Sequence, residues 1–515
     1  MNLRPVASLC RILLAGLAAT VAVAVRAEDA RVVDIGTRRQ LFVDDTLIGQ
    51  SQGTDLRLHQ PIARETVLAF DAPWEGSGSD FERVIRDGDI IRMYYMACLL
   101  TTDGGTRIGR QDGGYACVVE SRDGIHWVRP DLGLVEFQGS RHNNIVWTEP
   151  KLDNFTPFID TNPQCPPEER YKAMALGSQR ALCGFKSADG LRWTRISEKP
   201  LITHGKFDTQ NNAFWDPVRR QYWCYIRGFH GPDGRDVEPT HHATTGIRDI
   251  RVATSSDFRT WTEPQRLKFP GSPDEALYTN QVEPYYRAPD LFVGFPTRYV
   301  DREFSAAALD ALPSPAHRRN RMKFVPRYGT VITDGQFMTS HDGTSFHRWD
   351  ESFIPPGPER SNNWLYGDGY QSLGLIETPA ADPTAEPELS FYADEGHWMD
   401  GQTVRRYTLR IDGFASVHAR KAGGEFTTRP LVFSGKKLAL NFATAAAGSI
   451  WVEVRDAAGR PIAGFTRAAC DTLFGDTLGR TVTWGGRSDV SALAGRPVRL
   501  RFVMSEADLY SLKFE

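Results

Sequence analysis

Five short stretches of the chain place an aromatic residue beside carboxylates or amides. They are 79–82 (Ser-Asp-Phe-Glu), 158–162 (Phe-Ile-Asp-Thr-Asn), 207–212 (Phe-Asp-Thr-Gln-Asn-Asn), 278–283 (Tyr-Thr-Asn-Gln-Val-Glu) and 366–371 (Tyr-Gly-Asp-Gly-Tyr-Gln). An aromatic face packs against C–H surface, while carboxylates and amides hydrogen-bond hydroxyl groups. This mixture predicts sites for a polyhydroxylated ligand such as a sugar.

Acidic residues in these stretches are the candidates for acid–base chemistry. They are Asp80, Asp160, Asp208 and Glu283, with Glu82 as a substitute for Asp80. Cleavage of a glycosidic bond needs two carboxyl groups that flank it, one as acid and one as base or nucleophile. The alternative interpretation is structural, because such acids can also cap strand ends or bind a cation on an axis. Both interpretations stay open at this point.

A second set of residues is suited to holding a substrate. These residues are Asn212, Arg227, Arg298, Asp368, Glu395 and Trp398. Arg227 and Arg298 each follow a strand-like run, and a guanidinium there could bind a substrate carboxylate, hold a catalytic acid or form an ordinary ion pair. Glu395 is an alternative acid, and Trp398 a platform for a sugar ring.

A recurring turn indicates a repeat architecture. It reads Ser-x-Asp-Gly-x-x-Trp at 121–127 and 187–193, Ser-x-Asp-Phe-x-x-Trp at 255–261 and Ser-x-Asp-Gly at 340–343, with a weaker fifth copy at 410–414. The Asp can accept a hydrogen bond from the backbone two residues on, and Gly takes a positive φ cheaply. An Asp used in this way is occupied by its turn, so these copies count structural units and carry no chemistry.

Runs rich in aromatic and β-branched residues lie between the turns and predict strands, as at 91–95, 222–226, 291–295 and 389–392. Sustained helical periodicity is almost lacking. The sequence therefore predicts an all-β fold, with a five-bladed β-propeller as the main body.

The expected boundaries are a propeller at 28–428 and a C-terminal β-sandwich at 429–515. The opening segment, 32–45, is expected to pair with the last blade and close the ring. The aromatic–acidic stretches would then lie at the beginning of the innermost strands. These strands converge on the central axis, and propellers bind ligands at one end of that axis.

This plan of turns and domains resembles the family 32 and family 43 glycoside hydrolases, which include fructosidases, arabinanases and xylosidases. The sequence lacks the fructosidase signatures Trp-x-Asn-Asp-Pro-Asn-Gly, Arg-Asp-Pro and Glu-Cys. Only residues 41–45, Leu-Phe-Val-Asp-Asp, are weakly similar to the first of them. The resemblance implies Asp80 as base or nucleophile and Asp160 as an orienting residue. It implies Asp208 or Glu283 as a general acid whose pKa neighbouring carboxylates raise. The missing signatures indicate a divergent family.

The expected activity is hydrolysis of glycosidic bonds in a poly- or oligosaccharide. The alternatives are a non-catalytic carbohydrate-binding propeller and a glycoside phosphorylase or lyase. An anion site near Arg227 and Arg298 would favour a phosphorylase. A basic loop at 313–327 suggests an acidic or sulfated glycan, and the loop at 229–248 with its two histidines could be a lid or a weak metal site.

Residues 1–27 combine a basic start, an apolar run over 12–25 and an alanine-rich exit, which predicts a signal peptide and a periplasmic or extracellular protein. The net charge of −3 gives no case for a nucleic-acid or membrane partner. No residue spacing matches a metal or cofactor motif. None is expected, apart from a structural calcium ion on the propeller axis as an open alternative.

Overall fold

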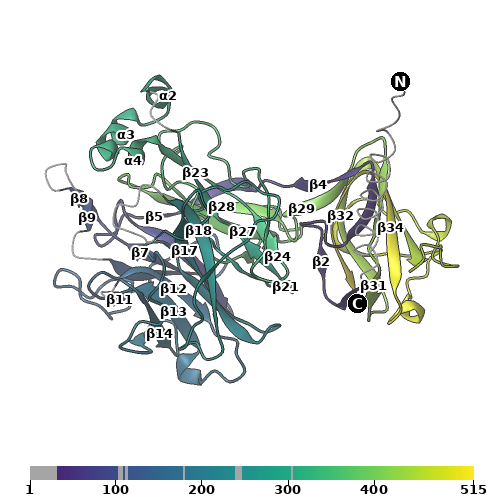
Figure 1. The fold of residues 1–515 in the computed structure, drawn as a ribbon, viewed down its shortest axis with the longest axis horizontal. Coiled ribbons are helices and arrows are strands. Elements are labelled where there is room, and N and C mark those ends of the chain that lie inside the picture. The colour runs from purple at the N-terminus through teal and green to yellow at the C-terminus, as the bar shows by residue number, and fades with distance from the viewer. Residues whose placement is uncertain (1–31, 103–107, 111–113, 178–179, 238–245, 303–305) are drawn as a thin grey trace, which may run out of the picture. The chain divides into compact units, whose positions relative to one another are not determined.

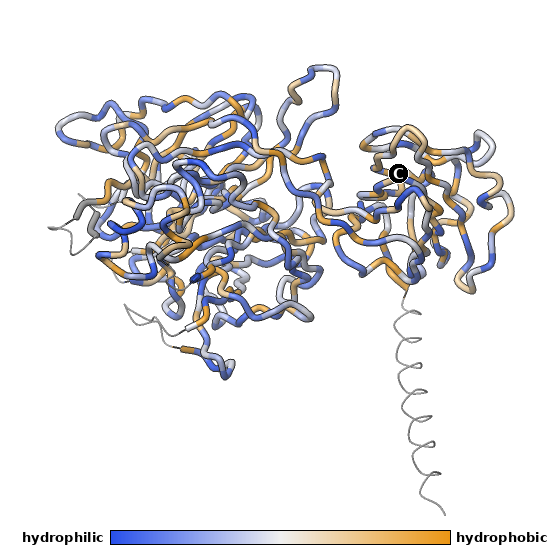
Figure 2. The backbone as a smooth tube through the Cα atoms, turned by 90° about the horizontal axis from the view of Figure 1, so that it is seen from above, coloured by the Kyte–Doolittle hydropathy of each residue, from blue (hydrophilic) through white to orange (hydrophobic). Residues whose placement is uncertain are grey.

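The computed structural model describes residues 32–102, 108–110, 114–177, 180–237, 246–302 and 306–515. It divides into two compact units, Gln60–Ile411 and the residues up to His59 together with Asp412–Glu515. Hydrophobic residues are spread over both units (Figure 2). The expected signal peptide at 1–27 lies outside the described residues, so export stays a prediction.

The larger unit is a five-bladed β-propeller, which confirms the predicted main body. Its described residues form five four-stranded antiparallel sheets (Figure 1). From the inner strand outward, blade 1 is β6 (Asp80–Asp87), β7 (Ile90–Ala97), β10 (Tyr115–Ser121) and β11 (Ile145–Thr148). Blade 2 is β12 (Asp153–Ile159), β13 (Tyr171–Leu176), β14 (Leu182–Ser187) and β15 (Thr194–Arg195).

The other three blades repeat this order. Blade 3 is β16 (Asn212–Asp216), β17 (Gln221–His230), β18 (Ile247–Ser255) and β19 (Gln265–Arg266). Blade 4 is β20 (Glu283–Tyr285), β21 (Ala288–Gly294), β24 (Met338–Ser340) and β25 (His347–Arg348). Blade 5 is β26 (Ile376–Thr378), β27 (Glu388–Glu395), β28 (Thr403–Arg410) and β5 (Ile62–Ala69).

The ring is closed by β5, the first strand of the propeller unit, which pairs with β28 of the last blade. The sequence put this closure at 32–45, and that expectation is wrong. Residues 33–36 and 40–41 pair with strands of the smaller unit instead. Consequently the propeller begins at Gln60 and ends at Ile411, whereas the sequence placed it at 28–428.

The repeated turns have the structural role predicted for them. In the first copy, Asp123 accepts hydrogen bonds from the backbone N–H groups of Ile125 and His126, and Ser121 Oγ accepts one from Gly124. The copies at 187–193, 255–261 and 340–343 repeat this pattern. The weak fifth copy differs, since its Asp412 belongs to the smaller unit and accepts from Ser511.

Blade 4 carries an insertion between its second and third strands. The ribbon of β22 (Thr297–Asp301) and β23 (Val331–Gly335) leads to three short helices, α2 (Ala306–Ala311), α3 (Pro315–Met322) and α4 (Arg327–Thr330). The helices lie together on one side of the propeller unit (Figure 1). In blade 1, β8 (Leu100–Thr102) and β9 (Ile108–Arg110) form a second ribbon.

The smaller unit is also all-β. Its described strands form a ten-stranded sheet. They are β1 (Val33–Gly36), β2 (Gln40–Leu41), β3 (Ile48–Gln52), β4 (Thr54–Leu58), β29 (Ala415–Ala419), β30 (Gly424–Thr428), β31 (Leu431–Phe433), β32 (Leu438–Asp456), β33 (Asp476–Thr481) and β34 (Val498–Phe514). Short 3-10 turns lie at Arg467–Ala469 and Ser491–Leu493 in this unit, and at Pro167–Glu169 in the propeller unit. The unit buries one hydrophobic cluster that includes Phe42, Phe426 and Phe502.

Within the described ranges, no helix has the length and apolar character needed to cross a membrane.

Candidate functional site

The inner strand of blade 1 opens in an irregular conformation. A register shift between Asp80 and Arg83 interrupts the pairing of β6 with β7, and Phe81 adopts a φ of 61°. A bulge of this kind changes the direction of the side chains around it, and a non-glycine residue at positive φ is strained. As a result, the start of β6 does not follow the plain in–out alternation of a strand.

An ion pair crosses the propeller axis. Arg83 of blade 1 donates to Glu283 of blade 4 over 2.8 Å and to the carbonyl of Pro157 in blade 2 over 3.1 Å. Glu283 is therefore held by a guanidinium, which is unlike the general acid surrounded by carboxylates that the resemblance implied. The same guanidinium places positive charge where the optional calcium ion was expected, so these residues do not fit that cation.

Amide side chains fill the space next to this pair. Gln210 donates to the carbonyls of Phe81 and Glu82 over 3.1 and 3.2 Å, and Gln281 donates to Gln210 over 2.7 Å. Asn212, predicted to bind substrate, is buried and donates to the carbonyl of Val282. These bonds connect the loop that carries Asp208 to the start of β6.

Buried carboxyl groups meet beside Asp80. Glu82 and Asp394 of β27 are each 1% exposed, and their carboxyls lie close enough for each to influence the pKa of the other. Burial raises the pKa of Glu82 to about 6. Burial, together with repulsion from Glu82 and Asp80, raises the pKa of Asp394 well above its ordinary value. At mildly acidic pH this group therefore retains a proton.

Asp208 has the opposite character. Its side chain is 47% exposed and forms an ion pair with Arg227, near the end of β17, while Lys206 Nζ lies 3.6 Å from its Oδ2. Burial raises the pKa of Asp208, but Arg227 and Lys206 outweigh it and hold the pKa below its ordinary value. The expectation of an acid with a raised pKa is wrong here, because the neighbours of Asp208 are cations.

An aromatic cluster joins the two carboxyl sites. Tyr370 stacks on Phe81, next to Asp80, with ring centroids 5.7 Å apart, and on Tyr278 with centroids 5.2 Å apart. Tyr278 in turn lies under the Arg227 guanidinium, 4.6 Å from its Cζ. Asp80, Asp208 and Arg227 thus border one set of rings at the end of the propeller where the inner strands of blades 1 and 3 begin.

Trp398 belongs to the same end. Its ring lies 5.8 Å from that of Tyr366, and the Arg321 guanidinium lies 4.4 Å above it. Trp398, Arg321, His317 and Phe324 line part of a pocket of about 410 Å³. Trp398 therefore lies at a polar pocket, and its role as a platform for a sugar ring stays a prediction.

Asp160 lies at the other end of the propeller, which contradicts its predicted position. It follows the last residue of β12, whereas Asp153 is the residue that opens this strand. Its carboxylate contacts Lys172 Nζ at 2.5 Å and accepts from the Tyr222 hydroxyl over 2.7 Å, and all three groups are largely buried. The sequence misplaced Asp160 because both ends of a short inner strand carry an aromatic residue and an acid.

Three further predicted residues are engaged within the protein. Asp368 accepts from the backbone N–H groups of Leu365, Gly396 and His397, and burial raises its pKa to about 7. Glu395 accepts two hydrogen bonds from Arg405 and one from Arg360. Arg298 forms a bidentate pair with Asp334. Each of them is therefore occupied by contacts within the protein, and its role in binding substrate stays a prediction.

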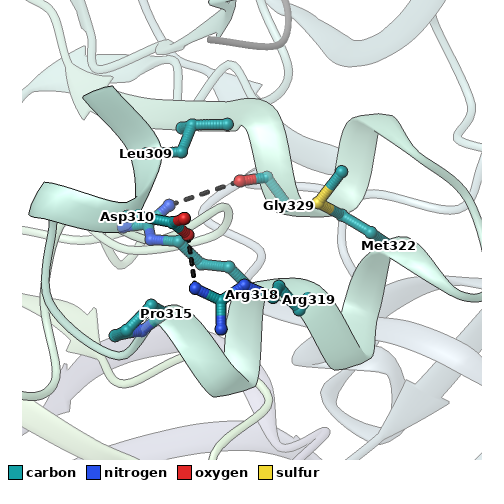
Figure 3. Close-up of a pocket in the computed structure, with 7 residues that line it drawn as sticks. All are labelled: Leu309, Asp310, Pro315, Arg318, Arg319, Met322 and Gly329. Atoms are coloured by element: carbon teal, nitrogen blue, oxygen red, sulfur yellow. Dashed lines mark hydrogen bonds and ion pairs between the residues drawn. The ribbon is translucent and has the colours of Figure 1, made fainter. Parts of the chain in front are cut away.

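The basic stretch at 313–327 is largely helical, and its cations point in several directions. Arg318 is buried and donates to the carbonyl of Gly329, whereas Arg319 pairs with Asp310 over 2.6 Å (Figure 3). Arg321 is buried as well and donates to the carbonyls of Tyr366 and His397. The stretch therefore holds the blade 4 insertion onto blade 5. The histidines expected to form a lid or metal loop, His241 and His242, lie outside the described residues.

Sequence reasoning missed Asp394 and Arg248 as members of the site. Asp394 lies next to Glu395 at the end of β27, in a segment rich in polar residues. Successive side chains of a strand point to opposite faces of the sheet, so this neighbour of Glu395 was the available signal. Arg248 stands near the start of β18, directly opposite Phe229 of β17, and only the strand register places it beside Arg227.

No group of three or more His, Cys, Asp or Glu side chains in the described part of the chain is arranged to hold a metal ion.

No protein-family model and no curated protein sequence matches the chain. Solved structures do match. A glycoside hydrolase is 13% identical, covers 68% of this chain and 92% of its own, and gives a TM-score of 0.41. An N-acetylgalactosamine deacetylase from F. plautii in complex with blood group B trisaccharide is 13% identical, with 71% and 96% covered and a TM-score of 0.38. A β-1,2-mannobiose phosphorylase from Listeria innocua is 11% identical, with 66% and 91% covered and a TM-score of 0.37.

These neighbours include glycoside hydrolases and phosphorylases, at identities that concern the fold alone. The five-bladed propeller that the resemblance predicted is established by the order of the sheets.

Proposed function

We propose that the protein is a glycoside hydrolase that cleaves a poly- or oligosaccharide at the aromatic-lined mouth formed by blades 1, 3, 4 and 5. The observation that carries this proposal is that two carboxyl sites border one aromatic cluster, and that their surroundings shift the carboxyl pKa in opposite directions. Asp208 is half-exposed and held as an anion by cations. Glu82 and Asp394 are buried and hold a proton.

Glycosidases need this division, because one carboxylic acid protonates the leaving oxygen while a carboxylate attacks or activates water. In the proposed mechanism, Asp208 is the base or nucleophile. Asp80 stands between the substrate and the buried pair of Glu82 and Asp394, and it passes their proton to the glycosidic oxygen. This reverses the roles that the resemblance implied for Asp80 and Asp208, since the cations lie at Asp208 and the other carboxyls lie at Asp80.

The aromatic rings supply the platform for the sugar. Tyr278 is half-buried between the two carboxyl sites, and Trp398 lines the adjoining pocket. Sugar rings stack on such faces, and the Asp208 carboxylate is near enough to Tyr278 to influence the pKa of its hydroxyl.

The test is a digest of a glycan panel with detection of new reducing ends, comparing the unmodified protein with Asp80→Asn. We expect reducing ends from at least one glycan and a loss of about 10²-fold or more in the variant, the range of an acid–base residue. Binding of a glycan without any cleavage would contradict the proposal and would favour the carbohydrate-binding alternative.

A further inference from the structure

Two guanidinium groups and one ammonium group lie around the single carboxylate of Asp208, so positive charge is in excess there. Arg227 is 3% exposed and pairs with Asp208 through Nη2, while its Nε and Nη1 are buried without a partner among the described residues. Arg248 is 9% exposed, and its side-chain Nε is buried without a hydrogen-bond partner among the described residues. With Lys206, three cations surround one carboxylate.

The two arginines are held by the same aromatic rings. The Cζ atoms of Arg227 and Arg248 each lie 5.6 Å from the Phe229 ring, and they lie 4.6 and 5.7 Å from the Tyr278 ring. Arg248 also lies 3.8 Å from the Tyr299 ring. Cation–π contacts orient a guanidinium but leave its charge uncompensated. A buried cation without a counter-charge is costly, so it is expected where a ligand supplies the anion.

We propose that Arg227 and Arg248 bind an anionic substituent of the sugar substrate, a carboxylate or a sulfate, and make the enzyme selective for acidic glycans. This inference rests on the proposed function of the same site. A guanidinium presents a planar fork of donors that matches an oxyanion. Both arginines contact the Tyr278 ring, which stacks on Tyr370. The acidic-glycan preference predicted from 313–327 thus comes from a different place, since Arg318 and Arg321 of that stretch are buried on backbone carbonyls.

The experiment uses calorimetric binding and hydrolysis assays on the full chain. The probes are oligosaccharides of glucuronic or galacturonic acid, sulfated oligosaccharides, neutral oligosaccharides of the same length, and inorganic phosphate. We expect at least one acidic glycan to bind about tenfold or more tightly than its neutral counterpart. Arg248→Gln should remove this preference, weakening the acidic glycan about tenfold or more while changing the neutral one by less than about twofold.

Arg192→Gln is the matched control, because Arg192 is exposed and lies at a repeated turn on the other end of the propeller. It should leave both affinities unchanged. Should Arg248→Gln fail to fold, Arg248→Lys keeps the charge without the planar fork and should still weaken acidic glycans selectively.

Three results would overturn the inference. Neutral and acidic glycans could bind and be cleaved equally well, which would leave the proposed hydrolase intact. Cleavage could require inorganic phosphate and release a sugar phosphate, which would assign the arginines to phosphate. Finally, no glycan of any charge could bind, in which case the proposed function fails together with this inference.

Discussion

Asp160 and Asp208 occupy similar sequence contexts, each close to an aromatic residue and to an amide. Their surroundings in the fold differ, because Asp160 is buried against Lys172 at one end of the propeller and Asp208 is half-exposed at the other. Local composition therefore identified residues able to do chemistry without identifying the end of the strand on which they lie.

Replacing Asp160 by Asn should lower stability and spare activity. The change leaves the Lys172 ammonium buried without its closest counter-charge, which costs about 3 kcal/mol of unfolding free energy. Urea unfolding measures the loss, and turnover per folded molecule should stay within about twofold of the unmodified protein. A stable but inactive variant would return Asp160 to the catalytic residues.

Glu82 should make stability depend on pH. Burial raises its pKa from an ordinary value of 4.5 to about 6, so between these values the folded state keeps a proton that the unfolded state has released. The unfolding free energy should therefore fall as pH rises through this window. Urea unfolding from pH 4 to pH 8 measures the slope, and Glu82→Gln should flatten it. An equal slope in the variant would contradict the raised pKa of Glu82.

The strand β5 is the element that closes the propeller. Leu68 is 6% exposed and lies opposite Val404 of β28, whereas Ile62 of the same strand is 56% exposed. Leu68→Ala should lower the unfolding free energy by about 2–5 kcal/mol, because it leaves a cavity in the core between blades 5 and 1. Ile62→Ala is the control and should change it by less than about 0.5 kcal/mol. Equal effects of the two substitutions would argue against closure by β5.

At the level of elements, the repeated turns made the propeller predictable. Ser, Asp and Gly at fixed spacing encode a local hydrogen-bond pattern, and four copies have it in the structure. The closing strand was misassigned because strand pairing across the whole length of a chain leaves no local signal. The bulge at Phe81 and the meeting of Glu82 with Asp394 depend on that long-range pairing too, and so escaped prediction.

At the level of the whole molecule, the chain starts in one unit, builds the other and then returns. The strands β1, β2, β3 and β4 pair with β31, β34, β30 and β29, all of which follow the propeller in sequence. The sequence placed the domain boundary at 429 because the composition changes there. Composition alone does not reveal that strands from the N-terminal side also belong to the smaller unit.

Removing residues 32–58 should therefore damage the smaller unit selectively. The deletion exposes the edges of β29 and β31 and takes Phe42 out of the hydrophobic cluster. Limited proteolysis with mass spectrometry should show early cleavage within 412–515 and a resistant fragment near 60–411. Equal resistance of the two regions would contradict this division of the chain.

The central claim is that the chemistry takes place at the mouth where Asp208 faces the proton-holding carboxyls. The most direct test compares Asp208→Asn with Asp160→Asn in turnover of the glycan that the unmodified protein cleaves. The account predicts a loss of about 10²-fold or more for Asp208→Asn and turnover near normal for folded Asp160→Asn. Full activity in Asp208→Asn, or a selective loss in Asp160→Asn, would place the reaction elsewhere.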